Sequence, residues 1–313
     1  MNAAGDHPRD NASCSMPKKK KSSRSRRASR IPSFRRLLVL SFSAALVALQ
    51  ASSCGFHPTL PGGGQGAPTS PASRPAPAPG PAPAPAPLPA GQQVHTRFAE
   101  CPQFFAPGGM PIVPGQRALR ELCFDSFAVL HSGSTRTPVL VAERLSRAVL
   151  QQGKGLKRSD RFFADARLPA AERAQLEDYR GSGYSRGHMA PAGDMPTAAA
   201  MAQSFSLANM VPQDQQHNAG AWAKIEADTR SYAMRAAGDV YVITGPVFDA
   251  NPTRIGGGRV AVPSHLFKLV YDPGTRKAWA HWQQNAPGTR PGPPISYDEL
   301  VRRTDMQLLP ALR

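Results

Sequence analysis

A stretch of proline, alanine and glycine limits where this chain can form a folded domain. Twelve of the 33 prolines lie between Pro58 and Pro89, and residues 57–92 contain almost no large apolar side chain. Such a segment cannot bury enough apolar surface to collapse, which favours an extended spacer. Use as a proline-rich ligand is the alternative, but the monotonous Ala-Pro alternation favours the spacer. We therefore predict a linker over residues 55–97.

The segment before the linker has the layout of an export signal. Residues 1–54 hold 11 Lys and Arg against two Asp, and the basic region precedes the apolar run LLVLSFSAALVALQA at 37–51. This run is shorter than the about 20 apolar residues that span a membrane, although retention as an uncleaved anchor stays open. The sequence Ala-Ser-Ser-Cys resembles a lipoprotein cleavage site with Cys54 as the acylated residue, and ordinary cleavage near Ala51 is the alternative. We expect an exported protein, lipid-anchored or periplasmic in the cell envelope, or secreted.

Two cysteines remain in the part of the chain that follows the linker. In an oxidising compartment Cys101 and Cys123 are expected to form a disulfide. Closing a loop of about 22 residues would stabilise the fold by roughly 3 kcal/mol through the entropy of the unfolded chain. The alternative is a pair of unpaired buried thiols.

The apolar patterns after the linker predict one domain over residues 98–313. Runs rich in β-branched and aromatic residues predict strands at 122–130, 137–145, 238–248, 259–271 and 277–283. Helical patterns occur at 169–179, 197–205, 218–237 and 297–303. Because the strands follow one another in hairpin order, the fold class expected is α+β with a central, largely antiparallel sheet flanked by helices.

Residues 179–191, YRGSGYSRGHMAP, contain three glycines, two arginines and a histidine. A core strand or helix tolerates few glycines, because each one loses backbone entropy on folding and buries no side chain. The pattern indicates a segment built to contact a ligand. Residues 55–313 retain a net charge of +8 out of the total of +17, which weakly favours a polyanionic partner.

A second stretch, SLANMVPQDQQHNAGAWAKIE at 206–226, predicts a helix that begins near Asn218. Asn218, Trp222 and Glu226 are four residues apart, so on an ideal helix they share an arc of about 80°. The amide and the carboxylate can therefore address the same space. Upstream, KRSDRFFAD at 157–165 adds further basic side chains.

Four blocks, in order along the chain, resemble the DNA/RNA non-specific endonuclease family of ββα-metal (His-Me finger) nucleases. They are YRGSGYSRGHMAPAGDM, LANMVPQDQQHNAGAWAKIE, VYVITGPVF and VPSHLFKLVYD, and the resemblance covers most of residues 98–313. It implies that His188 is the general base, that Asn218 is the protein ligand of one Mg²⁺, which Mn²⁺ can replace, and that Glu226 organises water on the metal. It further implies that Arg186 and, with looser spacing, Arg158 contact phosphate.

These residue types suit hydrolysis of a phosphodiester. A neutral imidazole, with an ordinary pKa near 6.5, can accept a proton from water. A Mg²⁺ ion held by one amide oxygen keeps most of its waters and neutralises charge on the phosphate. Guanidinium groups donate two parallel hydrogen bonds to phosphate oxygens. The resemblance implies cleavage of internal bonds in DNA and RNA to give 5′-phosphate ends, with little sequence preference because phosphates carry no base identity.

One position departs from the family, where the aspartate of the Asp-Arg-Gly-His motif is Ser185. Loss of that charge allows an alternative function, a catalytically weak or inactive lipoprotein that binds polyanions.

Other interpretations concern single residues. Asn218 is also a plausible helix cap, and Glu226 a partner of Arg230. His217 could form a zinc site with His188, although a further ligand is lacking. Structural roles are expected for the remaining histidines considered, which are His131, His265 and His281.

Overall fold

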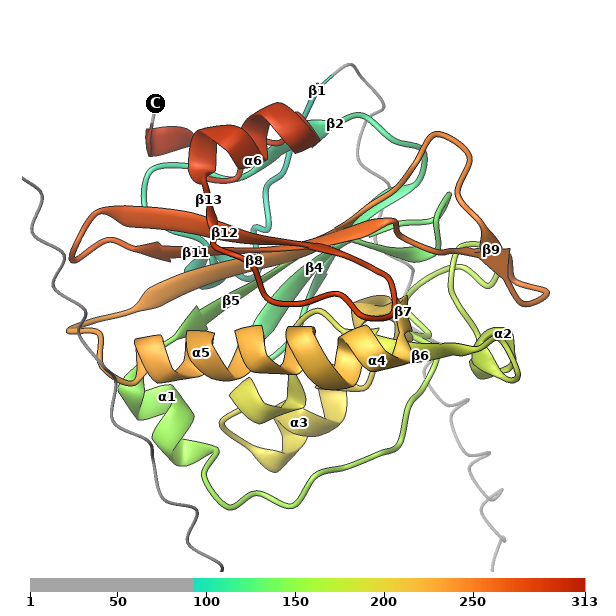
Figure 1. Cartoon of the computed structure of the whole chain (residues 1–313), viewed down its shortest axis with the longest axis horizontal. Coiled ribbons are helices and arrows are strands. Elements are labelled where there is room, and N and C mark those ends of the chain that lie inside the picture. Colours follow the sequence, from blue (N-terminus) through green and yellow to red (C-terminus); the bar gives the residue numbers. More distant parts are fainter. Residues whose placement is uncertain (1–92, 313) are drawn as a thin grey trace, which may run out of the picture. The chain divides into compact units, whose positions relative to one another are not determined.

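The computed structural model describes residues 93–312. The export segment, Cys54 and the linker up to residue 92 lie outside the described residues. Within the described part, seven strands form one antiparallel sheet in the order β13-β12-β11-β8-β5-β4-β3 (Figure 1). Their bounds are β3 Leu119–Cys123, β4 Phe127–Ser132, β5 Thr137–Leu145, β8 Val240–Val247, β11 His265–Asp272, β12 Lys277–Gln284 and β13 Ile295–Ser296. The predicted α+β class with a central antiparallel sheet is confirmed.

The sheet separates two cores because successive side chains of a strand point to opposite faces. On β4, Ala128 and Leu130 pack into one core, whereas Phe127 and Val129 pack into the other. Every residue of β4 is buried. The sheet is therefore covered on both faces, and Figure 1 shows α6 on one face and α5, α3 and α1 on the other.

The first face is closed by α6 (Tyr297–Thr304) and by a small antiparallel pair, β1 (Gln93–His95) with β2 (Ile112–Pro114). The disulfide Cys101–Cys123 joins this layer to the edge strand β3 and confirms the predicted pairing. Strand β1 begins five residues before the predicted start of the domain at residue 98, and its Val94 is buried. Residues assigned to the linker thus belong to a paired strand, because pairing with β2 satisfies their backbone groups.

The second face carries the helices and a separate two-stranded unit. This layer contains α1 (Arg147–Gln152), α2 (Leu176–Tyr179), α3 (Ala198–Ser204), α4 (Gln215–His217) and α5 (Ala223–Ala233), with the pair β6 (Tyr184–His188) and β7 (Met210–Asp214). A further short pair consists of β9 (Arg254–Ile255) and β10 (Val260–Ala261). The remaining single turns are η1 Pro102–Phe104, η2 Ala192–Asp194, η3 Leu207–Asn209, η4 Asn218–Trp222 and η5 Pro310–Leu312. In residues 93–312 no helix has the length and apolar character needed to cross a membrane.

The strand predicted at 122–130 is wrong as a single element. The chain turns between β3 and β4, where the Phe124 N–H donates to the carbonyl of Phe127. Both aromatic rings stay buried and stack with centroids 4.3 Å apart. The apolar pattern therefore continues through the turn, which hides it in the sequence. Likewise, the strand predicted at 259–271 is divided between β10 and β11.

The helix predicted at 169–179 forms only in its last four residues, as α2. The segment before α2 is held by tertiary hydrogen bonds. Glu172 accepts from Arg120, and the carbonyl of Glu172 lies 2.9 Å from His131 Nε2. Arg173 donates to the carbonyls of Asp165 and Leu168. These contacts fix the segment in turns and override its helical pattern.

Candidate active site

The glycine-rich segment predicted to lack regular structure contains strand β6, which was not expected. Gly187 lies on this strand opposite Val211 of β7. A Cβ at Gly187 would collide with the side chain of Gln213, so glycine allows the strand to pack there. Gly181 and Gly183, just before the strand, adopt positive φ values of 66° and 82° in the turn that leads into it. The glycines thus shape the turn into β6 and its close packing against β7, and the segment is not an irregular loop throughout.

The helix that follows β7 begins earlier than predicted and contains an irregular turn. Asp214 caps it by accepting a hydrogen bond from the His217 N–H at 2.9 Å. Asn218 therefore lies inside the helix and is not its N-cap, which excludes the plain capping interpretation. Residues Asn218–Trp222 form one π-helical turn before α5. Such turns are rare and occur often at functional sites.

The five residues predicted from the sequence come together in one cavity of about 280 Å³. They reach it from three parts of the chain, namely the 157–165 segment, strand β6 and the helix after β7. The predicted residues that line the cavity are Arg158, Arg186, His188, Asn218 and Glu226. The helical arc expected for Asn218 and Glu226 is altered by the π turn, yet both side chains face the same space.

His188 lies at the end of β6 with its ring packed between two phenylalanines. The ring centroid is 4.9 Å from that of Phe205 and 5.8 Å from that of Phe162. Its Nε2 is buried and has no hydrogen-bond partner among the described residues. Burial, with a smaller contribution from the positive charges of Arg158 and Arg186, lowers the pKa of His188 to about 3. The imidazole is therefore neutral at pH 7 and able to accept a proton.

A buried asparagine fixes the chain immediately after His188. Asn209 accepts from the Ala190 N–H through Oδ1 and donates through Nδ2 to the carbonyls of Ala190 and Ser204, each at 2.9 Å. It is fully buried. Sequence reasoning did not single out this residue, although it lies in the block LANMVPQ. An amide whose donor and acceptor are both satisfied by the backbone holds the end of β6 in place.

Arg158 and Arg186 approach the cavity over the same two aromatic rings. The Arg186 guanidinium carbon lies 4.0 Å from the centre of the Phe162 ring, and that of Arg158 lies 5.1 Å from the Phe205 ring. The segment that carries Arg158 is anchored downstream, where Phe163 exchanges backbone hydrogen bonds with Phe205 and Leu207. Stacking on a ring face orients a guanidinium without consuming its donors. Arg158 also donates from Nε to Asp160 at 2.9 Å, which leaves its two terminal nitrogens, together with the donors of Arg186, for a phosphate.

Glu226 reaches the cavity from α5, one turn before Arg230. Arg230 forms an ion pair with Asp194 at 2.8 Å, so the alternative interpretation of Glu226 as the partner of Arg230 is not what the structure contains. The Glu226 carboxylate has no hydrogen-bond or ion-pair partner among the described residues. Burial raises the pKa of Glu226 to about 7, opposed by Lys268 and reinforced by Asp194. Glu226 is thus a partly buried carboxylate whose oxygens remain available.

The cavity's oxygen donors fit a hard divalent cation. The Asn218 carboxamide makes no hydrogen bond to another described residue, and Glu226 lines the same cavity. Residues 93–312 contain no cluster of three or more His, Cys, Asp or Glu suited to a metal ion. A site with few protein ligands suits Mg²⁺, which retains several of its waters. His217 does not line the cavity; it is buried against Gln213 and Trp222, which removes the geometric basis for a zinc site with His188.

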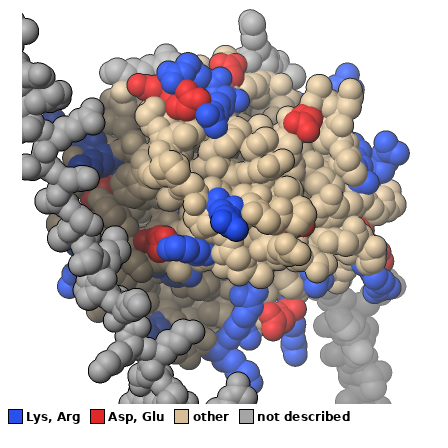
Figure 2. Space-filling view, in the orientation of Figure 1, with Lys and Arg blue, Asp and Glu red and all other residues tan. Residues whose placement is uncertain are grey.

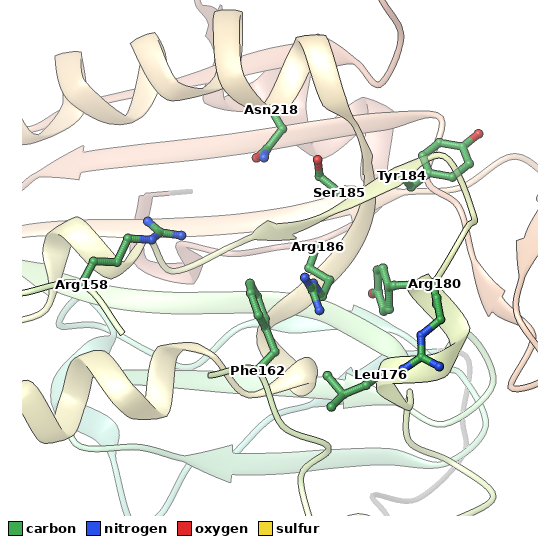
Figure 3. A pocket seen from close by; sticks show the side chains of 9 residues that line it. Arg158, Phe162, Leu176, Arg180, Tyr184, Ser185, Arg186 and Asn218 are labelled. Carbon is green, nitrogen blue, oxygen red and sulfur yellow. The ribbon is translucent and has the colours of Figure 1, made fainter. Parts of the chain in front are cut away.

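The cavity opens into a larger cleft of about 610 Å³ that shares Arg158, Arg186 and Asn218 with it. Figure 3 shows these three side chains entering the cleft from different elements. In the orientation of Figure 1, Figure 2 shows basic side chains projecting along the lower edge of the molecule, below α5. Three arginines line the cleft, Arg158, Arg180 and Arg186, and of these Arg158 forms an exposed ion pair with Asp160. A cleft with this excess of positive charge suits a polyanionic chain.

The sequence matches the DNA/RNA non-specific endonuclease family over residues 110–311. The chain belongs to this family. Mitochondrial nuclease EXOG of Xenopus laevis is 37% identical over 200 residues, which cover 59% of this chain and 54% of that protein. Human mitochondrial endonuclease G is 36% identical over 169 residues, covering 50% and 56%. Nuclease C1 of Cunninghamella echinulata var. echinulata is 38% identical over 161 residues, covering 48% and 64%.

The chain spans about half the length of the first of these curated relatives. A chain in the crystal structure of the EndoG/EndoGI complex, described as showing the mechanism of EndoG inhibition, has 25% identity and a TM-score of 0.57. The match covers 68% of this chain and 91% of that chain. The predicted family and its ββα-metal fold are confirmed, and β6, β7 and the helix from α4 to α5 form the ββα unit.

The departure from the family's motif lies inside the cleft. Ser185 pairs with Gln213 across β6 and β7 and lines the cleft together with Asn218. Figure 3 shows Ser185 on β6 and Asn218 on the helix that follows β7. The Ser185 side chain makes no hydrogen bond to another described residue, so β6 is held by pairing with β7 and by Asn209, which fixes the chain just after it. The histidines given structural roles, His131, His265 and His281, do not line the cavity or the cleft.

Proposed function

We propose that this protein is a metal-dependent, sequence-non-specific endonuclease that hydrolyses phosphodiester bonds of DNA and RNA to give 5′-phosphate ends. The observation that carries the proposal is the convergence of His188, Asn218 and Glu226 with two arginines around one open cavity. Family membership and relatives named as nucleases support it.

In this mechanism Arg158 and Arg186 bind the scissile phosphate, and His188 takes a proton from the attacking water. Without substrate the two arginines help to lower the pKa of His188. A phosphate bound between them would neutralise that positive potential and raise the pKa of His188 toward its ordinary value, which strengthens the base when it is needed. Phe162 and Phe205 limit the movement of the imidazole.

Asn218 would hold a Mg²⁺ or Mn²⁺ ion, with Glu226 ordering nearby water. The bound ion would neutralise negative charge on the phosphate and on the leaving 3′ oxygen. The two side chains suit this role because both present oxygen atoms to the cavity without a competing protein partner. Because the two arginines would contact phosphate, and phosphate contacts position a strand without identifying its bases, we expect weak sequence preference.

The proposal is tested by incubating the protein with supercoiled plasmid in Mg²⁺ or in a chelator. We expect nicking only with the metal, and products that accept a labelled 5′-phosphate only after phosphatase treatment. His188→Ala should lower the nicking rate about 1000-fold, within the range for loss of a general base. His95→Ala, which changes an exposed histidine outside the cavity, is the matched control.

The competing function is binding of polyanions without turnover, as the Ser185 departure allows. A salt-sensitive mobility shift of the plasmid, with no nicking by the wild-type protein at any Mg²⁺ or Mn²⁺ concentration, would establish it. Nicking that survives in His188→Ala at the wild-type rate would remove His188 from the mechanism.

We also propose that the protein is exported to the cell envelope or secreted. The disulfide Cys101–Cys123 supports this, because such bonds persist in oxidising compartments. Lipid attachment at Cys54 is part of the same proposal. The intact mass of the mature protein, purified from membranes and from the medium, tests it.

A further inference from the structure

We propose that the cleft beside the catalytic cavity is a nucleobase subsite, which takes the base of an unpaired nucleotide next to the scissile phosphate. It would favour single-stranded nucleic acid over duplex. This inference rests on the proposed nuclease function and adds a substrate class to it. The cleft holds about 610 Å³, which lies in the range of small-ligand sites.

The cleft and the catalytic cavity form one continuous groove. They share Arg158, Arg186 and Asn218 as lining residues. A strand whose phosphate lies between the two arginines therefore has a neighbouring nucleotide at the mouth of the cleft. Figure 3 shows Leu176, Arg180 and Tyr184 on the side of the cleft away from Arg158.

Apolar and aromatic side chains form part of the cleft wall. Leu176 of α2 is 36% exposed, one of three large apolar side chains that are exposed among the described residues. Phe162 and Tyr184 line the same cleft and are partly exposed. A nucleobase offers a flat apolar face of the kind that stacks on such side chains, and every base has one. The wall thus suits a base of any identity.

A buried hydroxyl without a partner points to a polar ligand. Tyr179 lines the cleft, is 6% exposed, and its hydroxyl has no hydrogen-bond partner among the described residues. Buried hydroxyl groups in folded proteins are nearly always hydrogen-bonded. Because a phenol both donates and accepts, it can bind the edge of any base. It therefore adds affinity without sequence preference.

Arg180 supplies the charge for a backbone phosphate at the far end of the cleft. It is exposed, and no ion pair to a described carboxylate occupies it. Together with Arg186 it would hold phosphates on either side of the bound base. The cleft thus combines stacking surface, a polar group and two cations, which is the combination that single-strand sites use.

A base in a duplex cannot enter this subsite without leaving its stack and its partner. Extrusion costs a few kcal/mol, and the cost is least for a strand that is already single. Phosphate contacts in the catalytic cavity are available to both substrates. The subsite therefore favours binding of single strands over duplexes, whereas the cavity binds the phosphates of both.

The experiment uses the full chain with Mg²⁺ and one 5′-labelled oligonucleotide, either single-stranded or paired with its complement. A stable abasic analogue is moved along the labelled strand, and the cleavage rate is measured at each bond. We expect faster cleavage of the single strand, and a loss of about 5-fold at the bond that lies at a fixed offset from the missing base.

Two variants are combined with the abasic substrate in a double-mutant cycle, in which a side chain and the base are removed separately and together. Tyr179→Phe and Leu176→Ala should each lower kcat/KM on the intact single strand by about 3- to 5-fold. They should leave the duplex rate unchanged and should lose the abasic effect, because the missing base and the missing side chain remove the same contact. Tyr241→Phe on β8 and Leu312→Ala, which is 37% exposed, are matched controls away from the groove.

The outcomes separate this inference from the proposed function. Nicking of plasmid by the wild-type protein, with no abasic effect at any offset, would overturn the base subsite and leave the nuclease intact. Equal losses on single strand and duplex in both variants would also overturn it, since that result indicates a structural effect. No cleavage of any substrate would reject the proposed function itself.

Discussion

The two faces of the central sheet are made by the same strands but bury different chemistry. Toward α6, the strands present apolar side chains such as Leu140, Ile243, Phe267 and Leu269. Toward α5, apolar positions such as Val141 and Val242 are interrupted by four buried polar or charged side chains. These are Glu143 on β5, Thr244 on β8, Lys268 on β11 and Gln283 on β12. One face therefore resembles an ordinary core, and the other supports a polar layer beneath the candidate active site.

Burying these polar side chains between the sheet and α5 costs free energy that an apolar layer would not cost. Lys268 is 1% exposed and donates to Thr244 Oγ1 at 2.7 Å, while neither oxygen of the equally buried Glu143 has a partner. Burial raises the pKa of Glu143 well above its ordinary range. Buried charges seldom add net stability. We infer that the apolar face and its disulfide supply much of the stability, and that the polar face serves the site.

The sharpest test of this division is Asn218→Ala on the polar face. Removing the amide oxygen should lower metal-dependent nicking about 100-fold or more, as expected when a metal's protein ligand is lost. The free energy of unfolding should change by less than about 0.5 kcal/mol, because the Asn218 side chain neither caps the N-terminus of the helix nor hydrogen-bonds to a described residue. Plasmid nicking over a range of Mg²⁺ concentrations and denaturant unfolding measure the two effects.

Asn251→Ala, at a loop position outside the groove, is the control for that variant. A large loss of stability in Asn218→Ala, with activity per folded molecule preserved, would contradict the division between the faces.

The complementary change is on the apolar face, where Cys101→Ser with Cys123→Ser removes the disulfide. The free energy of unfolding should fall by about 3 kcal/mol, the chain-entropy value for a loop of this length. The kcat of the folded fraction should stay at the wild-type value, since the bridge lies on the opposite side of the sheet from the ββα unit. Urea unfolding and nicking at low temperature measure these, with the reduced wild-type protein as control.

A third test uses a buried titratable group behind the loop that leads to the cleft. Burial lowers the pKa of His131 to about 4. The unfolded chain therefore binds a proton that the folded chain does not, so the stability contributed by neutral His131 is lost as the pH falls from about 6.5 toward 4. Between pH 6.5 and 5 the free energy of unfolding should fall by roughly 1.5 kcal/mol from this group.

His188 titrates in the same direction, so the readout is the difference in slope between wild type and His131→Asn. An unchanged slope in the variant would show that His131 has the same pKa in the folded and the unfolded chain, as a histidine exposed to water would. Thermal unfolding across the pH range supplies the measurement.

The smallest expected effect concerns Ser185, which lines the cleft beside Asn218. Ser185→Asp places a carboxylate near the proposed metal ligand, and an added opposite charge should lower the Mg²⁺ concentration needed for half-maximal stabilisation by about 5-fold. The shift of Tm with Mg²⁺ reports binding independently of cleavage. Ser231→Asp on the exposed side of α5 carries the same charge outside the groove and should leave the Mg²⁺ requirement unchanged.

The site was more predictable than the fold around it. Arg186 and His188 lie two residues apart on one strand, and Asn218 and Glu226 lie eight residues apart on one helix, so local geometry kept each pair together. The resemblance of the four blocks then indicated that the two pairs meet. The structure places both pairs around one cavity.

Other elements depended on contacts that no local pattern contains. The turn between β3 and β4 is hidden because Phe124 and Phe127 are both buried, and the helix predicted before α2 is replaced by turns that Arg120 and His131 hold. Glycine has a low preference for strands, yet Gly187 lies in β6. Any larger residue there would collide with the side chain of Gln213 on the paired strand. The errors at α2 and β6 arose where a side chain distant in sequence competed with local preference, whereas the turn between β3 and β4 was hidden by its own buried residues.

The sequence alone determined the α+β class, the disulfide partners and the chemical types gathered at the site, because alternation, cysteine number and motif spacing are local properties. The tertiary structure decided which faces those residues share. It placed the polar positions of four strands under α5, left the hydroxyl of Tyr179 without a partner, and joined the catalytic cavity to the adjacent cleft. Those outcomes depend on how strands pair and helices dock across the whole domain, and burial and desolvation follow only from that packing.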